Sequence, residues 1–151
     1  MSYTIRTCSQ TYKVQDIVSF MLKTKSILYN KEATDGLRIS VMSRHTLNDG
    51  VTPHPEILDS SYDEWIQILA PPARLIGDYY NRGLHWDKFE QRYLDYIRTS
   101  NIQIEVHKLA ERSLDSVITL LCIEGSPEYC HRRLLAEECK RYQPDLVLSI
   151  Q

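Results

Sequence analysis

The chain of 151 residues has the length of a single domain with one sizeable core, and 42% hydrophobic and 25% charged residues are ordinary for a globular protein. Its formal net charge of −2 gives no global field that would attract nucleic acid or an acidic membrane, so any anion site has to be local. There is no apolar run long enough to span a bilayer, and the first residues lack the basic and then apolar order of a signal peptide. These features predict a cytoplasmic protein that forms one domain over residues 1–151 and has no membrane partner.

The N-terminal part is expected to combine a helix with short strands. Apolar residues recur at helical spacing over residues 13–23, which predicts an amphipathic helix. Residues 3–8 and 26–29 each have the composition of a short strand. An Asp-Gly turn at Gly36 then precedes a strand over residues 37–42.

The middle of the chain is rich in aromatic residues and is expected to be helical. A helix capped by Ser60 or Ser61 should run to the prolines at 71–72, where a second helix starts. Two more helices are expected over residues 85–98 and 102–112, the first with a stripe of aromatic side chains on one face.

Residues 117–150 are the most informative segment of the chain. An apolar run over residues 117–124 predicts a central strand buried on both faces, and a capped helix and a second short strand follow it. In such units ligands collect where the strand ends and the helix begins, because unpaired helix N–H groups point there. The order of elements predicts an α/β fold with Rossmann-like strand–helix–strand units and a mostly parallel sheet of three to five strands, flanked by helices.

Four ordered motifs carry a resemblance to a known family. They are the Asp-Gly turn with its strand up to Arg44, Trp65 with the Leu-Ala-Pro that follows it, the aromatic and charged residues 86–93, and residues 117–133. Together they are similar to the family called domain of unknown function 488, over residues 27–150, with residues 1–26 as an N-terminal extension that holds a helix. The resemblance implies a fold and a site but no established activity. The family commonly has an Asp after the earlier strand, where this chain has Ser43, so the resemblance implies no acid or base there.

Cys130 is a candidate nucleophile. Ser126 is a natural N-cap and Pro127 a natural first helical residue, so Cys130 is expected about one turn into the helix, where the dipole lowers a thiol pKa. We therefore expect it to be the most reactive of the four thiols. The alternative is that Cys130 is only a small buried apolar residue. A cysteine phosphatase loop is excluded, because neither Cys122 nor Cys130 is followed by an arginine six positions later.

The neighbouring polar residues each have two interpretations. His131 is either a catalytic group or a structural histidine bonded to a backbone carbonyl or to Glu124. Glu124 is either a general base beside a bound anion or one partner of a salt bridge with Arg132 or Arg44. Adjacent helical residues such as Cys130 and His131 point about 100° apart, so we expect no metal site. The usual dinucleotide and P-loop fingerprints do not occur, and no cofactor is predicted.

These observations support two classes of function. The first is an enzyme for a small anion or nucleotide at the strand–helix turn, with Cys130 or Glu124 as nucleophile or base and a ligand bound by Arg44, Cys122, Ser126, His131 and Arg132. Arg44 and residues 126–132 should converge, since both follow parallel strands. The second is a non-catalytic module that binds nucleic acid or a protein through the aromatic and basic residues 79–86. The sequence leaves open whether the protein is an enzyme and which oligomer it forms.

The cysteine pattern bears on the redox state. The four cysteines are Cys8, Cys122, Cys130 and Cys139, and no two of them form a C-x-x-C pair. Thiols stay reduced in the cytoplasm, so we expect no disulfide.

Overall fold

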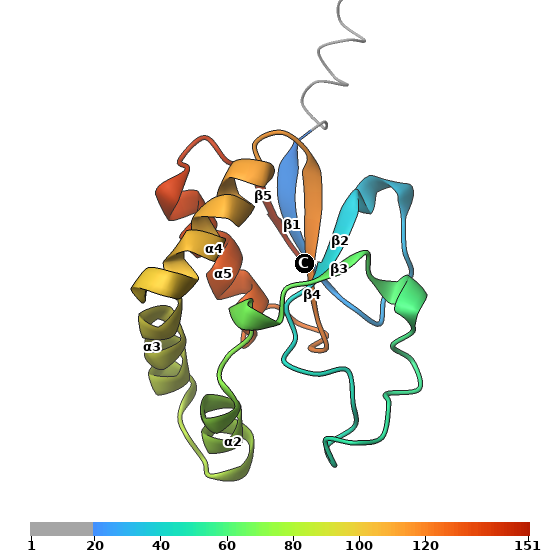
Figure 1. Cartoon of the computed structure of the whole chain (residues 1–151), viewed down its shortest axis with the longest axis vertical. Helices are drawn as coiled ribbons and strands as arrows, with labels where there is room; N and C mark the ends of the chain where they lie inside the picture. The colour runs from blue at the N-terminus through green and yellow to red at the C-terminus, as the bar shows by residue number, and fades with distance from the viewer. Residues whose placement is uncertain (1–19) are drawn as a thin grey trace, which may run out of the picture.

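The structure is a computed structural model that describes residues 20–151. Five strands form one sheet in the order β3-β2-β4-β1-β5, and the neighbouring strands run parallel to each other (Figure 1). This confirms the prediction of an α/β fold with a parallel sheet. In chain order the strands are β1 (Met21–Ser26), β2 (Leu37–Ser40), β3 (Glu64–Trp65), β4 (Val117–Cys122) and β5 (Leu148–Ile150).

Helices connect the later strands, because parallel strands need long crossovers. Figure 1 shows α3, α4 and α5 packed together on one side of the sheet, with α2 beyond its lower end. No helix within residues 20–151 has the length and apolar character needed to cross a membrane. The helices of this part of the chain are α2 (Ala73–Asn81), α3 (Trp86–Ile97), α4 (Ser100–Arg112) and α5 (His131–Tyr142), with short 3-10 turns η1 (Ala33–Asp35), η2 (Asp59–Ser61) and η3 (Gln67–Leu69).

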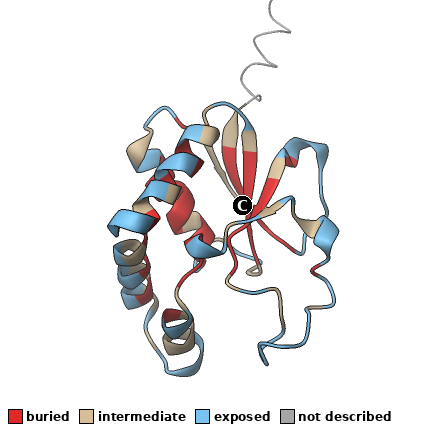
Figure 2. Cartoon of the chain, viewed as in Figure 1, coloured by how far each residue is buried: buried red, intermediate tan, exposed pale blue. Residues whose placement is uncertain are grey.

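Strand β4 is the centre of the sheet, as the apolar run predicts. It lies between β2 and β1, and its residues from Ile118 to Cys122 are buried. Ile118 and Leu120 belong to the main hydrophobic core together with residues of α3, α4 and α5. Buried residues occupy the middle of the sheet and the sides of the helices that face it (Figure 2).

The other face of the sheet carries buried charges instead of a helix. Lys25 of β1 and Arg38 of β2 both donate to the carboxylate of Asp35, with Nζ–Oδ1 3.0 Å and Nη1–Oδ2 2.6 Å. Lys23 Nζ donates to a backbone carbonyl at residue 34, so the crossover from β1 to β2 covers this face. Each of these four charged side chains is buried.

Gly36 explains why the crossover needs an Asp-Gly turn. Its φ is +61°, and a Cβ at this position would lie 2.2 Å from the carbonyl oxygen of Val117. A larger residue would therefore be strained in its backbone and would clash with β4.

The predictions for the N-terminal part were partly wrong. The helix expected over residues 13–23 cannot extend that far, because β1 begins at Met21. The strand expected over residues 26–29 does not form, since β1 ends at Ser26. The rest of the expected helix and the strand over residues 3–8 lie outside the described residues.

The helix predicted between Ser60 and the prolines is also wrong. This segment forms η2, the short strand β3 and η3. Its side chains bind residues that are distant in the sequence. Trp65 Nε1 donates to the Met42 carbonyl at 2.6 Å, and Glu64 forms an ion pair with Arg112 at 2.8 Å. These tertiary contacts outweigh the local helix propensity. The helices predicted on either side of Gly83 and over residues 102–112 are confirmed as α2, α3 and α4.

Glu138 of α5 should make the stability depend on pH in the acid range. Burial raises its pKa, but hydrogen bonds from Arg98 and Arg141 outweigh burial, so the pKa lies below its usual value. The stabilisation that the Glu138 carboxylate contributes is therefore fully present above the unfolded pKa of about 4.3. It is lost as pH falls through the folded pKa. In urea titrations, the stability difference between wild type and Glu138→Gln should shrink below about pH 4. A difference that stays constant down to the acid limit would contradict this assignment.

Candidate functional site

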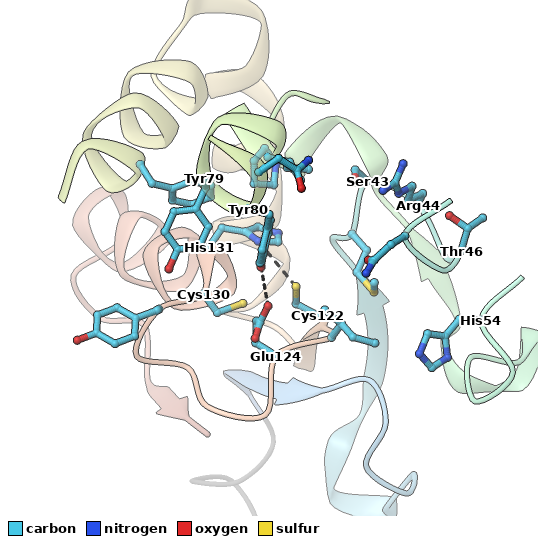
Figure 3. A pocket seen from close by; sticks show the side chains of 18 of the residues that line it. Ser43, Arg44, Thr46, His54, Tyr79, Tyr80, Cys122, Glu124, Cys130 and His131 are labelled. Carbon is cyan, nitrogen blue, oxygen red and sulfur yellow. Dashed lines mark hydrogen bonds between the residues drawn. The ribbon is translucent and has the colours of Figure 1, made fainter. Parts of the chain in front are cut away.

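A cavity of about 920 Å³ lies where β2 and β4 end, at the carboxyl edge of the sheet (Figure 3). Parallel α/β sheets usually bind their ligands at this edge. Three parts of the chain line it: the loop after β2, helix α2 with the start of α3, and the connection from β4 to α5. They place different chemistry on different sides of the cavity.

One side, which we call the aromatic wall, is formed by aromatic side chains from α2, α3 and the β4–α5 connection. The Trp86 ring stacks on Phe89 with centroids 5.0 Å apart and meets Tyr129 edge-on at 5.5 Å. Tyr80 is 58% exposed, so part of this wall is free to contact a ligand. The members of the aromatic wall are Tyr79, Tyr80, Trp86, Phe89 and Tyr129.

The opposite side, the polar wall, comes from the loop after β2. It includes Arg44, Thr46 and His54, which Figure 3 shows across the cavity from Tyr79 and Tyr80. Arg44 is exposed and makes no ion pair or side-chain hydrogen bond with any residue in the range 20–151. The Thr46 hydroxyl oxygen is buried and has no hydrogen-bond partner among the described residues. Asp49 lies on the same wall, and its pKa is lowered by hydrogen bonds within its own turn and also by the charge of Arg44. The polar wall thus holds an exposed cation with an acidic neighbour and a hydroxyl without a partner in this part of the chain.

The inner end of the cavity, the thiol corner, is formed by Cys122, Cys130 and His131. Cys122 is the last residue of β4, and the other two stand at the start of α5. Their two sulfur atoms and a ring nitrogen of His131 all lie within 4.8 Å of one another. All three side chains are buried in the protein, yet all three line the cavity.

His131 is held in one orientation. Its Nε2 lies 2.8 Å from the carbonyl oxygen of Val41, which follows β2, and its Nδ1 lies 3.8 Å from the Cys122 sulfur. A carbonyl only accepts, so Nε2 carries the proton and the Nδ1 lone pair faces the sulfur atoms. The expected structural hydrogen bond to a carbonyl is therefore present, and it prepares the other nitrogen for a ligand role.

Glu124 lies beside the thiol corner and takes part in no salt bridge with Arg132 or Arg44. The Tyr80 hydroxyl donates to its Oε1 at 2.5 Å, as Figure 3 shows. Burial, followed by this hydrogen bond and the negative charge of Glu124, raises the pKa of Tyr80. The hydroxyl therefore stays protonated and orients the carboxylate at the cavity.

A comparison with known protein families identifies the family of this chain. Residues 22–143 match the family model DUF488-N3a, described as the active DUF488-N3 subclade. The chain belongs to the DUF488 family. No curated protein and no solved structure matches this DUF488 chain.

The two thiols of this DUF488 protein differ in acidity. The pKa of Cys122 is lowered, first by a hydrogen bond from the Cys130 thiol and further by the Glu124 backbone N–H and the charge of Arg132, while burial opposes the shift. The same contact with Cys122 and burial raise the pKa of Cys130. Of the pair, Cys122 is the group that ionises first.

The predicted start of the last helix was wrong, and with it the argument for activating Cys130. Helix α5 begins at His131, and Cys130 is its N-cap with extended backbone angles (φ −135°, ψ 137°). The Cys130 N–H donates to the Pro127 carbonyl, so the residues after Ser126 form a separate turn. Cys130 is therefore the residue before the first helical turn, at the positive end of the helix dipole. The contact with Cys122 and burial outweigh the dipole and raise the pKa of its thiol.

Two residues predicted as ligand contacts lie elsewhere. Ser126 is exposed and bonds the backbone N–H of Glu128, and Arg132 is buried and donates to the carbonyls of Glu124 and Gln151. Neither lines the cavity. Arg44 does share the cavity with Cys130 and His131, so these parts of the two strand ends lie at the same edge of the sheet.

Sequence reasoning missed the contribution of residues 46–54. This loop supplies Thr46, Asn48 and His54 to the polar wall. The only local signal of this loop is the turn at Gly50, where φ is +72°. The Asp49 carboxylate accepts hydrogen bonds there from the backbone N–H groups of Val51 and Thr52. Such a signal predicts a turn but does not indicate which part of the molecule the loop contacts.

Proposed function

We propose that this DUF488 protein is an enzyme that binds a small anionic ligand of nucleotide type and carries out its chemistry beside the thiol corner. The observation that carries the proposal is that one cavity combines the aromatic wall, the exposed Arg44 cation and the thiol corner. Its volume of about 920 Å³ falls within the range of small-molecule sites. The family description, which calls the subclade active, agrees with an enzyme.

The two walls suit the two ends of a nucleotide. Aromatic faces stack on bases, and Trp86 and Tyr80 supply such faces. A guanidinium binds a phosphate through two parallel hydrogen bonds. Arg44 makes no ion pair in the described part of the chain, and its charge interacts with that of Asp49, which also lines the cavity. A ligand that spans the cavity would therefore place its middle near the thiol corner.

Glu124 is the proposed general base. Its carboxylate lines the cavity, and the Tyr80 hydroxyl holds one of its oxygens, which leaves the other available to accept a proton. The sequence offered Cys130 as an alternative catalytic group. We assign Cys130 to the thiol corner as a partner of Cys122, because the residue is only 2% exposed and the pKa of its thiol is raised.

The alternative function, a nucleic-acid or protein-binding module using residues 79–86, is less well supported. Tyr79, Tyr80 and Trp86 turn toward the same cavity as the thiol corner, so they contribute to a concave site.

Replacing Arg44 by Ala should weaken ligand binding by roughly 10- to 100-fold, the effect of losing a charge-assisted hydrogen bond to a phosphate. Calorimetric titration with a panel of nucleoside mono-, di- and triphosphates and with inorganic phosphate measures the effect. Binding to the wild type should also weaken as salt rises.

The matched control is Arg74→Ala, an equally exposed arginine of α2 that does not line the cavity. It should leave the affinity unchanged, and both variants should unfold at nearly the wild-type urea concentration. If no member of the panel binds, or if both variants bind equally well, the proposed ligand class is wrong.

A further inference from the structure

We propose that the thiol corner is a zinc site in which Cys122, Cys130 and His131 bind the metal and a fourth position opens to the cavity. Two cysteines and one histidine with an open position form a known class of catalytic zinc site. The binding of zinc stands on the geometry of these three residues alone, whereas its use in a reaction rests on the proposed function.

The spacing of the three ligand atoms fits one tetrahedral ion. With Zn–S of about 2.3 Å and Zn–N of about 2.0–2.1 Å, a sulfur and a nitrogen ligand lie about 3.6 Å apart. Cys122 Sγ lies 3.8 Å from His131 Nδ1, and the whole set lies within 4.8 Å. Only small rotations of these side chains are needed to reach ligand distances.

The objection from the sequence, that Cys130 and His131 point apart as neighbours on a helix, does not hold. Cys130 is the extended N-cap of α5, so its side chain is not placed by helical geometry. It lines the cavity together with His131, and both reach the end of β4 where Cys122 lies.

His131 also has the outer contact that zinc-binding histidines have. Such a histidine donates its second ring N–H to a carbonyl or carboxylate, which fixes the tautomer and the ring plane. His131 Nε2 makes this bond to the Val41 carbonyl at 2.8 Å. The free Nδ1 is therefore the nitrogen that faces the two sulfur atoms.

The chemistry of the ligand set selects the metal. Thiolate and imidazole favour zinc and other borderline or soft ions over magnesium or calcium, which take oxygen ligands. Two thiolates and one Zn²⁺ have no net charge, so the ion can occupy this buried position without leaving a charge uncompensated.

The open position defines the class of reaction. All three ligands line the cavity, so the fourth position is reached by water or by a bound ligand. A zinc ion held here would lower the pKa of a bound water, and Glu124, which lines the same cavity, would accept the proton that this water loses. The reaction class that follows is hydrolysis: the water oxygen would form a bond to an electrophilic atom of the nucleotide-like ligand, the bond from that atom to its leaving group would break, and Glu124 would return the proton to the leaving group.

The test uses the full chain, purified in reductant and without chelator. Mass spectrometry of the metal content should find about one zinc per chain, and Co²⁺ in its place should give sulfur-to-metal charge-transfer bands. Cys122→Ser and His131→Ala should each weaken zinc binding by more than the roughly 10- to 100-fold that loss of an outer-shell partner causes. Cys139→Ala is the matched control, since this buried thiol contacts the Val106 carbonyl and should leave zinc binding intact.

A measurement on the wild type covers the case in which a variant does not fold. Zinc should protect Cys122 and Cys130 from alkylation, and a chelator should expose them. The proposal is overturned if the reduced wild type takes up neither zinc nor Co²⁺ in equilibrium dialysis, or if folded Cys122→Ser keeps the same zinc affinity. A disulfide between Cys122 and Cys130 in the zinc-supplied, reduced protein would overturn it as well.

The two proposals can fail separately. Nucleotide binding that depends on Arg44 is measured on chelator-treated protein, where zinc plays no part. If the chelator-treated protein binds no member of the nucleotide panel while the untreated protein carries about one zinc per chain, the proposed ligand class is wrong and the metal site stands.

Discussion

Replacing Asp35 by Asn is expected to lower the free energy of unfolding by about 3–5 kcal/mol, the usual effect of breaking a buried ion pair. Asp35 is completely buried, accepts from Lys25 and Arg38 and also pairs with Lys23 at 3.8 Å. The substitution therefore removes the counter-charge of three buried cations, of which, among the described residues, only Lys25 has a second acidic partner, Glu32 at 3.6 Å. The amide keeps the size of the side chain, and the change therefore isolates the charge. Urea unfolding followed by circular dichroism measures it.

The matched control is Asp95→Asn on the exposed side of α3, which should change stability by less than about 0.5 kcal/mol. Equal midpoints for the two variants would mean that the cations of this face are compensated by their backbone partners alone. Lys25 does donate to the carbonyl of Asn30 and Arg38 to that of Ser61, so this outcome has a definite structural basis.

The same group of charges shows why β1 was hard to predict. A buried strand is normally recognised by an apolar run, but β1 carries Lys23 and Lys25 on its buried face. These two lysines are buried because Asp35, at the far end of the crossover from β1 to β2, forms ion pairs with both of them. No local pattern records this pairing, and the helical spacing of the preceding apolar residues was therefore extended too far.

Elements whose pattern is local were predicted well. The unbroken run from Val117 gave β4 and its central position, and the aromatic stripe that includes Phe89 and Tyr93 gave α3. Phe89 and Tyr93 face the main core, whereas β4 has Ile118 and Leu120 in the main core and Leu121 and Cys122 in a second hydrophobic cluster. Their environment can be inferred from their own spacing.

The sequence predicted which edge of the sheet holds the cavity, but not how the residues at that edge are arranged. Parallel strand ends meet at one edge, and this rule placed Arg44 near Cys130 and His131. The start of α5 was misplaced because Ser126 and Pro127 are typical of a helix start, whereas the observed turn depends on Arg133, which donates to the Pro127 and Glu128 carbonyls. The partnership of Cys122 with Cys130 follows from that later start.

Arg132 is the residue whose role changed most between sequence and structure. Its side chain is completely buried, and its Nη1 and Nη2 donate to the carbonyls of Glu124 at 2.7 Å and Gln151 at 3.1 Å. It thus ties the turn after β4 to the end of the sheet beyond β5. A guanidinium reaches both carbonyls at once, because its donors form a rigid fork.

Replacing Arg132 by Lys is therefore expected to destabilise the protein by about 2–4 kcal/mol. The donors of an ammonium share one nitrogen atom, which cannot occupy the positions of both Nη1 and Nη2, so at least one of the two carbonyls should lose its hydrogen bond. Urea unfolding measures the loss, and Arg74→Lys on the surface of α2 should show almost none. Because the Glu124 carbonyl lies next to the thiol corner, a looser turn should also speed the alkylation of Cys122 in zinc-free protein. Wild-type stability together with unchanged alkylation would show that the turn is held by its backbone contacts without this arginine.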